Sequence, residues 1–257
     1  MPYTKLAVEK QNGYVVAAIN HPPANALGQR VLIDLNTLLD ETLEYPEIRV
    51  IVLTGTGEKL FSAGADVTEF NSVQAEDKSK IEGNDLFSKI ENYPKPVIAA
   101  IQGSAYGGGT EIALACHFRI LAETAKIGLP EVKLGIMPGW GGTQRLPRLI
   151  GKTKALEMLL TGDPLSSEEA FSFGLVNKVV LASQVLPEAM ALAARLAQGA
   201  PVAIRGILKA VTKGLESTID EGIKIEDAAS AVVSASEDAK EGPRAFLEKR
   251  KANFQGI

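Results

Sequence analysis

Two glutamates in apolar, glycine-rich surroundings are the side chains best suited to chemistry. Glu111 follows three glycines at 107–109 and opens the apolar run 112–116, and Glu131 follows Pro130. A carboxyl group among apolar neighbours is poorly solvated, which adapts its pKa for proton transfer. Each also has an ordinary interpretation, because a first-turn glutamate complements a helix dipole and Pro-Glu is a common helix start. The sequence therefore indicates an acid–base pair and leaves the structural alternative open.

Glycine supplies a second component of a site. Gly108 lies just before the helix, where its backbone N–H can point at an oxyanion with the positive helix end behind it. A second amide is available from the turn Ser62-Ala63-Gly64. Two amides can polarise a carbonyl, and two carboxyl groups can move protons at the carbons beside it. Together these groups favour enolate chemistry, although each glycine alone could be a turn residue.

Other site types find little support. Ile150-Gly-Lys-Thr153 resembles the end of a phosphate-binding loop, but Leu146 stands where that motif needs glycine. His21 and His117 are the only histidines, and neither has a metal-ligand spacing. We therefore predict no metal and no separate cofactor. The single cysteine, Cys116, lies in an apolar helix pattern and is predicted to be a buried, inert thiol.

Composition limits the partners. The chain has 257 residues, with 27 Lys plus Arg against 31 Asp plus Glu and a net charge of −4. The absence of a long basic run argues against nucleic-acid binding. Apolar runs are too short to cross a bilayer, and the N-terminus has neither a signal-peptide nor a transit-peptide pattern. We expect a cytoplasmic protein without a membrane partner.

Two similar units position the candidate residues. The continuous apolar runs 49–54 and 96–101 predict parallel strands buried on both faces. Each run is followed by glycine (Gly55 or Gly103), then by a turn of small residues and a helix. The repetition predicts an α/β layered structure in which the two turns lie side by side at the strand ends.

The remaining patterns complete this α/β core and a helical C-terminal part. They predict strands at 4–9, 14–19, within 118–128 and at 175–181, and helices at 29–44, 79–92, 142–149, 152–161, from Pro187 onward, 218–235 and 243–252. Residues 71–78 are expected to be mobile. A boundary at 199–201 separates a core of residues 1–199 from a helical region of residues 200–257. The latter is too small for a core of its own, so we expect it to pack on the core, on another subunit, or on both.

Four motifs resemble those of the enoyl-CoA hydratase (crotonase) family. They are Phe61-Ser-Ala-Gly-Ala-Asp66, Gly103-Ser-Ala-Tyr-Gly-Gly-Gly-Thr-Glu111, Leu129-Pro-Glu131 and Pro138-Gly-Trp-Gly-Gly-Thr-Gln-Arg-Leu146. The likeness extends from Asn25 to Phe254. It implies a crotonase-like spiral of ββα repeats with a C-terminal helical oligomerisation region, assembled as a homotrimer or as a hexamer of two trimers.

The resemblance also implies roles for single residues. The amides of Ala63 and Gly108 are expected to hold the thioester oxygen of an acyl-CoA substrate, whose CoA is part of the substrate. The remaining predicted substrate contacts are Gly64, Ala65 and Asp66 along the CoA path, Gly139 at the water, and Lys249 at the CoA phosphates.

Hydratases of this family carry glutamate at both positions that match Glu111 and Glu131, which favours hydration of a trans-2-enoyl-CoA to a 3-hydroxyacyl-CoA. Glu131 is then expected to be the acid at the α-carbon, and Glu111 the water-activating partner. An isomerase, another acyl-CoA enzyme of this fold, or a non-catalytic RNA-binding relative stays open. The likeness suggests fatty-acid metabolism through β-oxidation, while acyl length, amino-acid breakdown and biosynthesis stay undecided. Two departures are His21-Pro-Pro-Ala-Asn25, where many relatives have a longer basic loop, and Trp140, which either shapes the acyl pocket or packs ordinarily.

Overall fold

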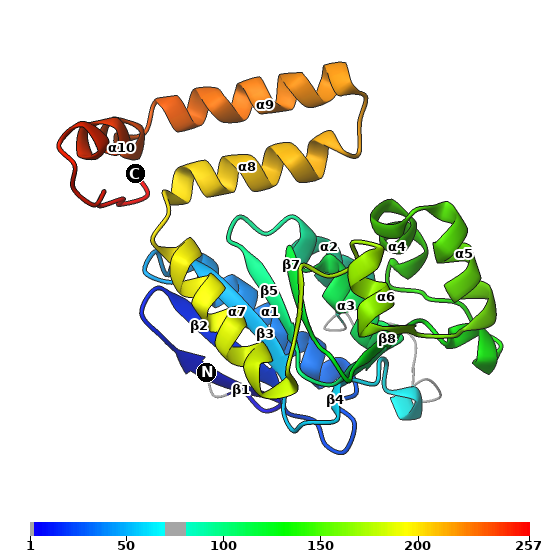
Figure 1. Ribbon diagram of the computed structural model, residues 1–257. Coiled ribbons are helices and arrows are strands. Elements are labelled where there is room, and N and C mark those ends of the chain that lie inside the picture. The colour runs from blue at the N-terminus through cyan, green and yellow to red at the C-terminus, as the bar shows by residue number, and fades with distance from the viewer. Residues whose placement is uncertain (1–2, 70–80) are drawn as a thin grey trace.

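The computed structural model describes residues 3–69 and 81–257 and shows an α/β core with helices that extend beyond it (Figure 1). The strands are β1 (Leu6–Lys10), β2 (Tyr14–Ile19), β3 (Val50–Gly55), β4 (Leu60–Ser62), β5 (Val97–Ile101), β6 (Ser104–Tyr106), β7 (Phe118–Ala122), β8 (Lys126–Gly128), β9 (Leu165–Ser166) and β10 (Lys178–Val180). The helices are α1 (Gln29–Glu44), η1 (Val67–Glu69), α2 (Gly83–Glu91), α3 (Gly108–Ala115), η2 (Glu131–Leu134), α4 (Gly142–Ile150), α5 (Lys152–Thr161), α6 (Ser167–Ser172), α7 (Ala182–Ala197), α8 (Pro201–Gly214), α9 (Ile219–Ser234) and α10 (Glu237–Leu247); η denotes a 3₁₀ helix.

The chain winds through repeated ββα units that build two sheets. The larger sheet has the order β1-β2-β3-β5-β7-β10 and the smaller one β4-β6-β8-β9. The first unit gives both of its strands, β1 and β2, to the larger sheet. The next units give their first strand to the larger sheet and their second to the smaller: β3 pairs parallel with β5, and β4 pairs parallel with β6. The predicted α/β spiral is confirmed. The turns after Gly55 and Gly103 do lie side by side, since Leu60 pairs with Ser104.

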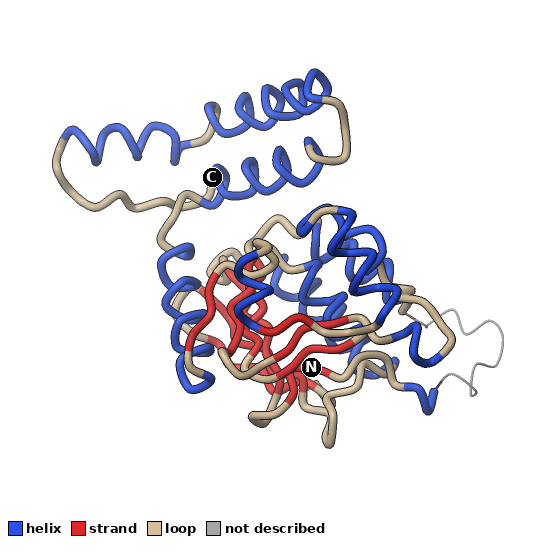
Figure 2. The backbone as a smooth tube through the Cα atoms, turned by 45° about the vertical axis from the view of Figure 1, so that its right-hand side comes forward, coloured by secondary structure: helices blue, strands red, loops and turns tan. Residues whose placement is uncertain are grey.

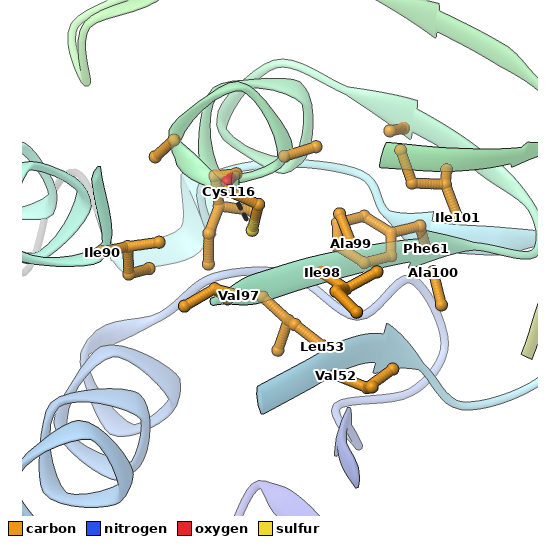
Figure 3. Packing of buried hydrophobic residues seen from close by; sticks show 14 of the residues in the cluster. Val52, Leu53, Phe61, Ile90, Val97, Ile98, Ala99, Ala100, Ile101 and Cys116 are labelled. Carbon is orange, nitrogen blue, oxygen red and sulfur yellow. Dashed lines mark hydrogen bonds between the residues drawn. The ribbon is translucent and has the colours of Figure 1, made fainter. Parts of the chain in front are cut away.

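The core forms where continuous apolar runs meet between layers. All residues of β3 and β5 are buried, and α7 packs across β3, β5 and β7 (Figure 1). Figure 3 shows Leu53, Ile98 and Phe61 packed together, with Cys116 buried nearby. Burial of a large apolar side chain stabilises the fold by about 1.5–3 kcal/mol. Burial also raises the pKa of the Cys116 thiol to about 12, so the thiol stays protonated at neutral pH.

Several predicted boundaries need correction. β4 and β6 lie in stretches that the sequence predicts to be turns. A three-residue strand between glycines is too short to show a periodic pattern, and these two strands form because they pair with each other. The strand predicted at 175–181 is only β10, and the last helix begins at Glu237, where Ser236 Oγ accepts a hydrogen bond from the Ala239 amide (3.2 Å). The mobility expected for 71–78 concerns residues outside the described part of the chain.

The C-terminal helices form an arm beside the core. α8 and α9 pack antiparallel against each other and stand apart from the sheets, and α10 follows at the end of the arm (Figures 1 and 2). Several large apolar side chains on this arm are exposed in the single chain, including Leu215 (79%), Ile219 (78%) and Phe246 (82%). Within one chain these side chains lack the apolar contacts that normally stabilise them.

Candidate active site

The first carboxyl group, that of Glu111, is held by the start of another helix. Glu111 lies in the first turn of α3 and is 2% exposed. Its Oε1 accepts hydrogen bonds from the amides of Trp140 and Gly142, both at 2.8 Å. Because Gly142 is the first residue of α4, the carboxylate faces the positive end of that helix.

The second carboxyl group, that of Glu131, lacks such donors. Glu131 opens η2 and is 8% exposed, and its Oε2 is buried without a hydrogen-bond partner. Its Oε1 lies against the glycine stretch before α3, since a Cβ added to Gly107 would be 3.2 Å from it. The carboxyl group of Glu131 therefore reaches the N-terminal end of the helix that carries Glu111.

The two environments give the carboxyl groups different acidities. Burial raises the pKa of Glu131 to about 7; the charge of Glu111 raises it further, while a hydrogen bond from the backbone of Glu131 itself opposes the rise. Burial also raises the pKa of Glu111, but the Gly142 and Trp140 amides and the positive charge of Arg145 act against it. The arrangement favours a protonated Glu131 beside an ionised Glu111.

The glycine stretch and the sister turn lie in direct contact. A Cβ added to Gly64 would be 2.9 Å from the nitrogen of Gly108, and one added to Gly108 would be 3.2 Å from the nitrogen of Ala65. The predicted approach of these two turns is therefore present. It also explains why glycine is needed at position 64, where φ is +101° and a side chain would be strained.

The prediction for the Ala63 amide is wrong. The Ala63 N–H donates to the carbonyl of Ala24 at 3.0 Å, so it is not available to an oxyanion. Within the described residues, the N–H of Ala65 has no acceptor, and Ala65 lies beside Gly108. The Ala63 amide is occupied because the parallel backbone bridge between Leu27 and Ala65 places the preceding residues of the two segments, Ala24 and Ala63, beside each other. Ala65 and Gly108 are thus the neighbouring pair of free amides.

The other residues predicted on the CoA path remain near this turn. Gly64 and Ala65 belong to it, and Asp66 follows them. The carboxylate of Asp66 accepts hydrogen bonds from the amide and hydroxyl of Thr68, which lower its pKa. Gly139 is exposed at the start of the loop that binds Glu111, with open space where a Cβ would stand.

Lys249 is not brought to this site within one chain. It follows α10, which the arm of α8 and α9 carries away from the core (Figure 1). The tail after it is fixed by Arg49 Nη2, which donates to the carbonyl of Phe254 at 2.7 Å. Arg49 precedes β3, whereas the site lies beyond the other end of that strand. The predicted contact of Lys249 with CoA is therefore not made in the chain's own site.

Trp140 and Arg145 surround the glutamate-binding loop. The Trp140 ring packs edge-to-face on Phe87 with 5.5 Å between centroids, and it lies so close to Gly83 and Gly108 that a Cβ on either would overlap it. Arg145 Nη1 donates to the Trp140 carbonyl at 3.0 Å. Sequence reasoning missed Arg145, because no spacing rule separates it from the other residues among 27 lysines and arginines.

The described residues contain no cluster of three or more histidine, cysteine or acidic side chains arranged to hold a metal ion. In the same part of the chain, no helix has the length and apolarity needed to pass through a bilayer. The site that the structure assembles consists of two carboxyl groups of different acidity and two adjacent amides. Such a set can polarise a carbonyl oxygen and transfer protons on either side of a nearby double bond.

Comparison with known proteins gives consistent results over the whole length. The sequence profile of the enoyl-CoA hydratase/isomerase family matches residues 9–256. A probable enoyl-CoA hydratase of Bacillus subtilis is 45% identical over 94% of this chain and 95% of its own, and a crotonyl-CoA hydratase of Syntrophomonas wolfei is 43% identical over 99% of both. The crystal structure of an enoyl-CoA hydratase from Bacillus anthracis superposes with a TM-score of 0.93 at 38% identity, covering 99% of this chain and 100% of that one.

Proposed function

The chain belongs to the enoyl-CoA hydratase/isomerase family, and from this premise we propose that it is a hydro-lyase that adds water across the 2,3 double bond of a trans-2-enoyl-CoA. The product is a 3-hydroxyacyl-CoA. The observation that carries the proposal is the pair of buried carboxyl groups, Glu111 with two amide donors and Glu131 with an unpartnered oxygen. Hydration needs one group that accepts a proton and one that donates it, and this pair supplies both.

The thioester oxygen binds between the amides of Ala65 and Gly108. As water adds to the β-carbon, negative charge develops on this oxygen. Two fixed amides stabilise that charge without reorganising, and the N-terminal end of α3 lies behind one of them. Removing one such donor in other enzymes slows the reaction by about 10²–10³.

Protons then move between water and the two carboxyl groups. The ionised Glu111 takes one proton from the water while the water oxygen forms a bond to the β-carbon. Glu131, protonated, gives its proton to the α-carbon, so that the double bond is consumed and the enolate collapses to the thioester. Glu111 ends protonated and Glu131 ionised, and exchange with solvent restores the starting state. Each transfer contributes about 10²–10⁴ to the rate.

The substrate's CoA lies along Ala63–Asp66, and Gly139 borders the water. Assembly as a trimer, or as a hexamer of two trimers, would cover the exposed apolar side chains of the arm. In such an assembly, Lys249 would reach the CoA of another subunit. The site is proposed to act on short acyl chains, because one similar protein is a crotonyl-CoA hydratase. The cytoplasmic location expected from the sequence stays part of the proposal.

The test is the absorbance of crotonyl-CoA, whose conjugated thioester loses its band on hydration. We expect enzyme-dependent loss of this band and formation of 3-hydroxybutyryl-CoA on chromatography. A 3-enoyl-CoA gives the opposite change if the protein is an isomerase, because conjugation is then created. Turnover of the 3-enoyl substrate with no loss of crotonyl-CoA would replace hydration by isomerisation.

A further inference from the structure

Three consecutive peptide groups connect Glu111 to Arg145. The outer two peptides supply the amides of Trp140 and Gly142, and both donate to Glu111 Oε1 at 2.8 Å. The peptide between them supplies the Trp140 carbonyl, which accepts from Arg145 Nη1 at 3.0 Å. The bond to Arg145 thus fixes the peptide that joins the two donor peptides. The guanidinium is therefore bonded to the backbone between the two donors of Glu111.

Arg145 is itself fixed from a second helix. It is 9% exposed, and its Nε and Nη2 donate to Glu91 Oε2 at 3.0 and 2.8 Å. Nη2 also lies 3.4 Å from Ser88 Oγ. Glu91 and Ser88 belong to α2, so the planar fork joins α2 to the start of α4. The guanidinium lies directly on the loop backbone, because a Cβ added to Gly141 would be 2.0 Å from Nη1.

We propose that Arg145 is a positioning residue for the hydration reaction: it holds the loop 139–142 so that two amides bind Glu111, and Glu91 holds Arg145 in turn. The inference rests on the proposed function for its catalytic meaning. Arg145 does not touch the reacting atoms. It acts through the direction and the charge of the Glu111 carboxylate.

The charges around Glu111 support the second part of this role. The positive charge of Arg145, from α4, lowers the pKa of Glu111 against the effect of burial. Glu131, from η2, is the other titrating group that faces Glu111, and Glu91, from α2, faces the far side of the guanidinium. Removing the cation leaves a buried carboxyl group beside another acid. Glu111 must then lose its proton at higher pH than before.

Another buried arginine shows what a purely structural role looks like. Arg119 donates to the carbonyls of Leu175 and Cys116, and its bonds lead to no carboxylate of the site. Arg145 differs because its acceptors are the peptide between the two Glu111 donors and a carboxylate on another helix. Arg148, one turn further along α4 and exposed, bonds only to Gln144 within the described residues and is a matched control.

The first measurement is independent of activity, since Trp140 is the only tryptophan in the chain. Its fluorescence and its quenching by acrylamide report the loop directly. We expect Arg145→Gln to raise the quenching constant at least twofold and to shift the emission to longer wavelength. Arg148→Gln should leave both unchanged. Unchanged quenching in a folded Arg145→Gln protein overturns the inference, whether or not the wild type hydrates crotonyl-CoA.

The second measurement separates charge from geometry. In Arg145→Gln, kcat should fall about 10–100-fold with KM changed less than threefold, and the acid limb of kcat/KM should move up by about one pH unit. Arg145→Lys keeps the charge but loses the fork, so kcat should fall less and the limb should stay in place. An unshifted limb in Arg145→Gln contradicts the charge role. If Arg145→Gln does not fold, the test passes to Arg145→Lys. In that case, an Arg145→Lys protein whose kcat and quenching constant both equal those of the wild type overturns the inference. A wild-type protein without hydratase activity removes the proposed function instead, and the quenching of Trp140 still shows whether Arg145 holds the loop 139–142.

Discussion

Glu111 and Glu131 belong to one site, and both are buried, yet the residues around them favour opposite protonation states. Glu111 receives two amides from the start of α4 and lies near the cation of Arg145. Glu131 has a buried oxygen without a partner. In the proposed reaction, the same residue type therefore serves as base in one place and as acid in the other. The assignment follows from the donors that neighbouring segments provide, not from the identity of the side chain.

The largest expected effect removes the acid half of this pair. Glu131→Gln keeps the shape of the side chain but replaces the transferable carboxyl proton, so kcat should fall about 10²–10⁴-fold. Crotonyl-CoA hydration at saturating substrate measures the loss, and circular dichroism checks the fold. Glu168→Gln, an exposed position on α6, is the control. Full activity in a folded Glu131→Gln protein would show that Glu131 is not the proton donor.

A smaller change disturbs only the surroundings of Glu111. A Cβ added to Gly142 would lie 3.0 Å from Glu111 Oε1, Leu129 Cδ1 and Pro138 Cβ, so Gly142→Ala must displace the carboxylate or the loop. We expect about a 10–100-fold loss of kcat, because a displacement near 1 Å has effects of this size. Gly242→Ala, where a Cβ meets only Phe254 at 3.6 Å or more, should leave kcat unchanged. Equal rates for the two variants would mean that the position of Glu111 is not critical.

The difference between the two glutamates was only partly predictable from sequence. The runs Val-Ile-Val-Leu at 50–53 and Val-Ile-Ala-Ala at 97–100 predicted the buried strands, because a strand covered on both faces is apolar throughout. Apolar and glycine-rich neighbours likewise identified Glu111 and Glu131. These are local signals, and the burial of both carboxyl groups agrees with them.

What the sequence could not supply depends on partners far along the chain. The Ala63 amide is occupied by the carbonyl of Ala24, so Ala65 provides the free donor beside Gly108. Arg145 finds Glu91 at a separation of 54 residues. No local pattern distinguishes one alanine from the other around Gly64, or this arginine from the exposed ones. Only the packed chain determines which amide is free and which cation is held.

The pH dependence tests the acidity of Glu131 directly. Its pKa is raised by burial to about 7, and the proposed reaction needs it protonated. The value of kcat/KM for crotonyl-CoA should therefore fall as pH rises through about 7, by about tenfold for each further unit. A series of buffers from pH 5 to 9 at constant ionic strength measures the limb. The residual activity of Glu131→Gln should lack it, and a limb that persists in that variant would belong to another group.

The smallest expected effect is on stability. The pKa of Glu131 is raised from 4.5 to about 7 in the folded protein, so the folded state holds a proton that the unfolded chain releases near 4.5. The associated stability is fully present below pH 4.5 and is lost as pH rises through 7, by roughly 1–3 kcal/mol. Urea unfolding at pH 5 and pH 8, at one protein concentration, measures the change in the free energy of unfolding. Glu131→Gln stays neutral at both pH values, so it should lose this part of the pH dependence.

The remaining carboxyl groups titrate in both proteins, so the difference between the two proteins reports the contribution of Glu131 alone. An identical pH dependence in the two proteins would place the folded pKa of Glu131 near its ordinary value and would remove the contrast with Glu111.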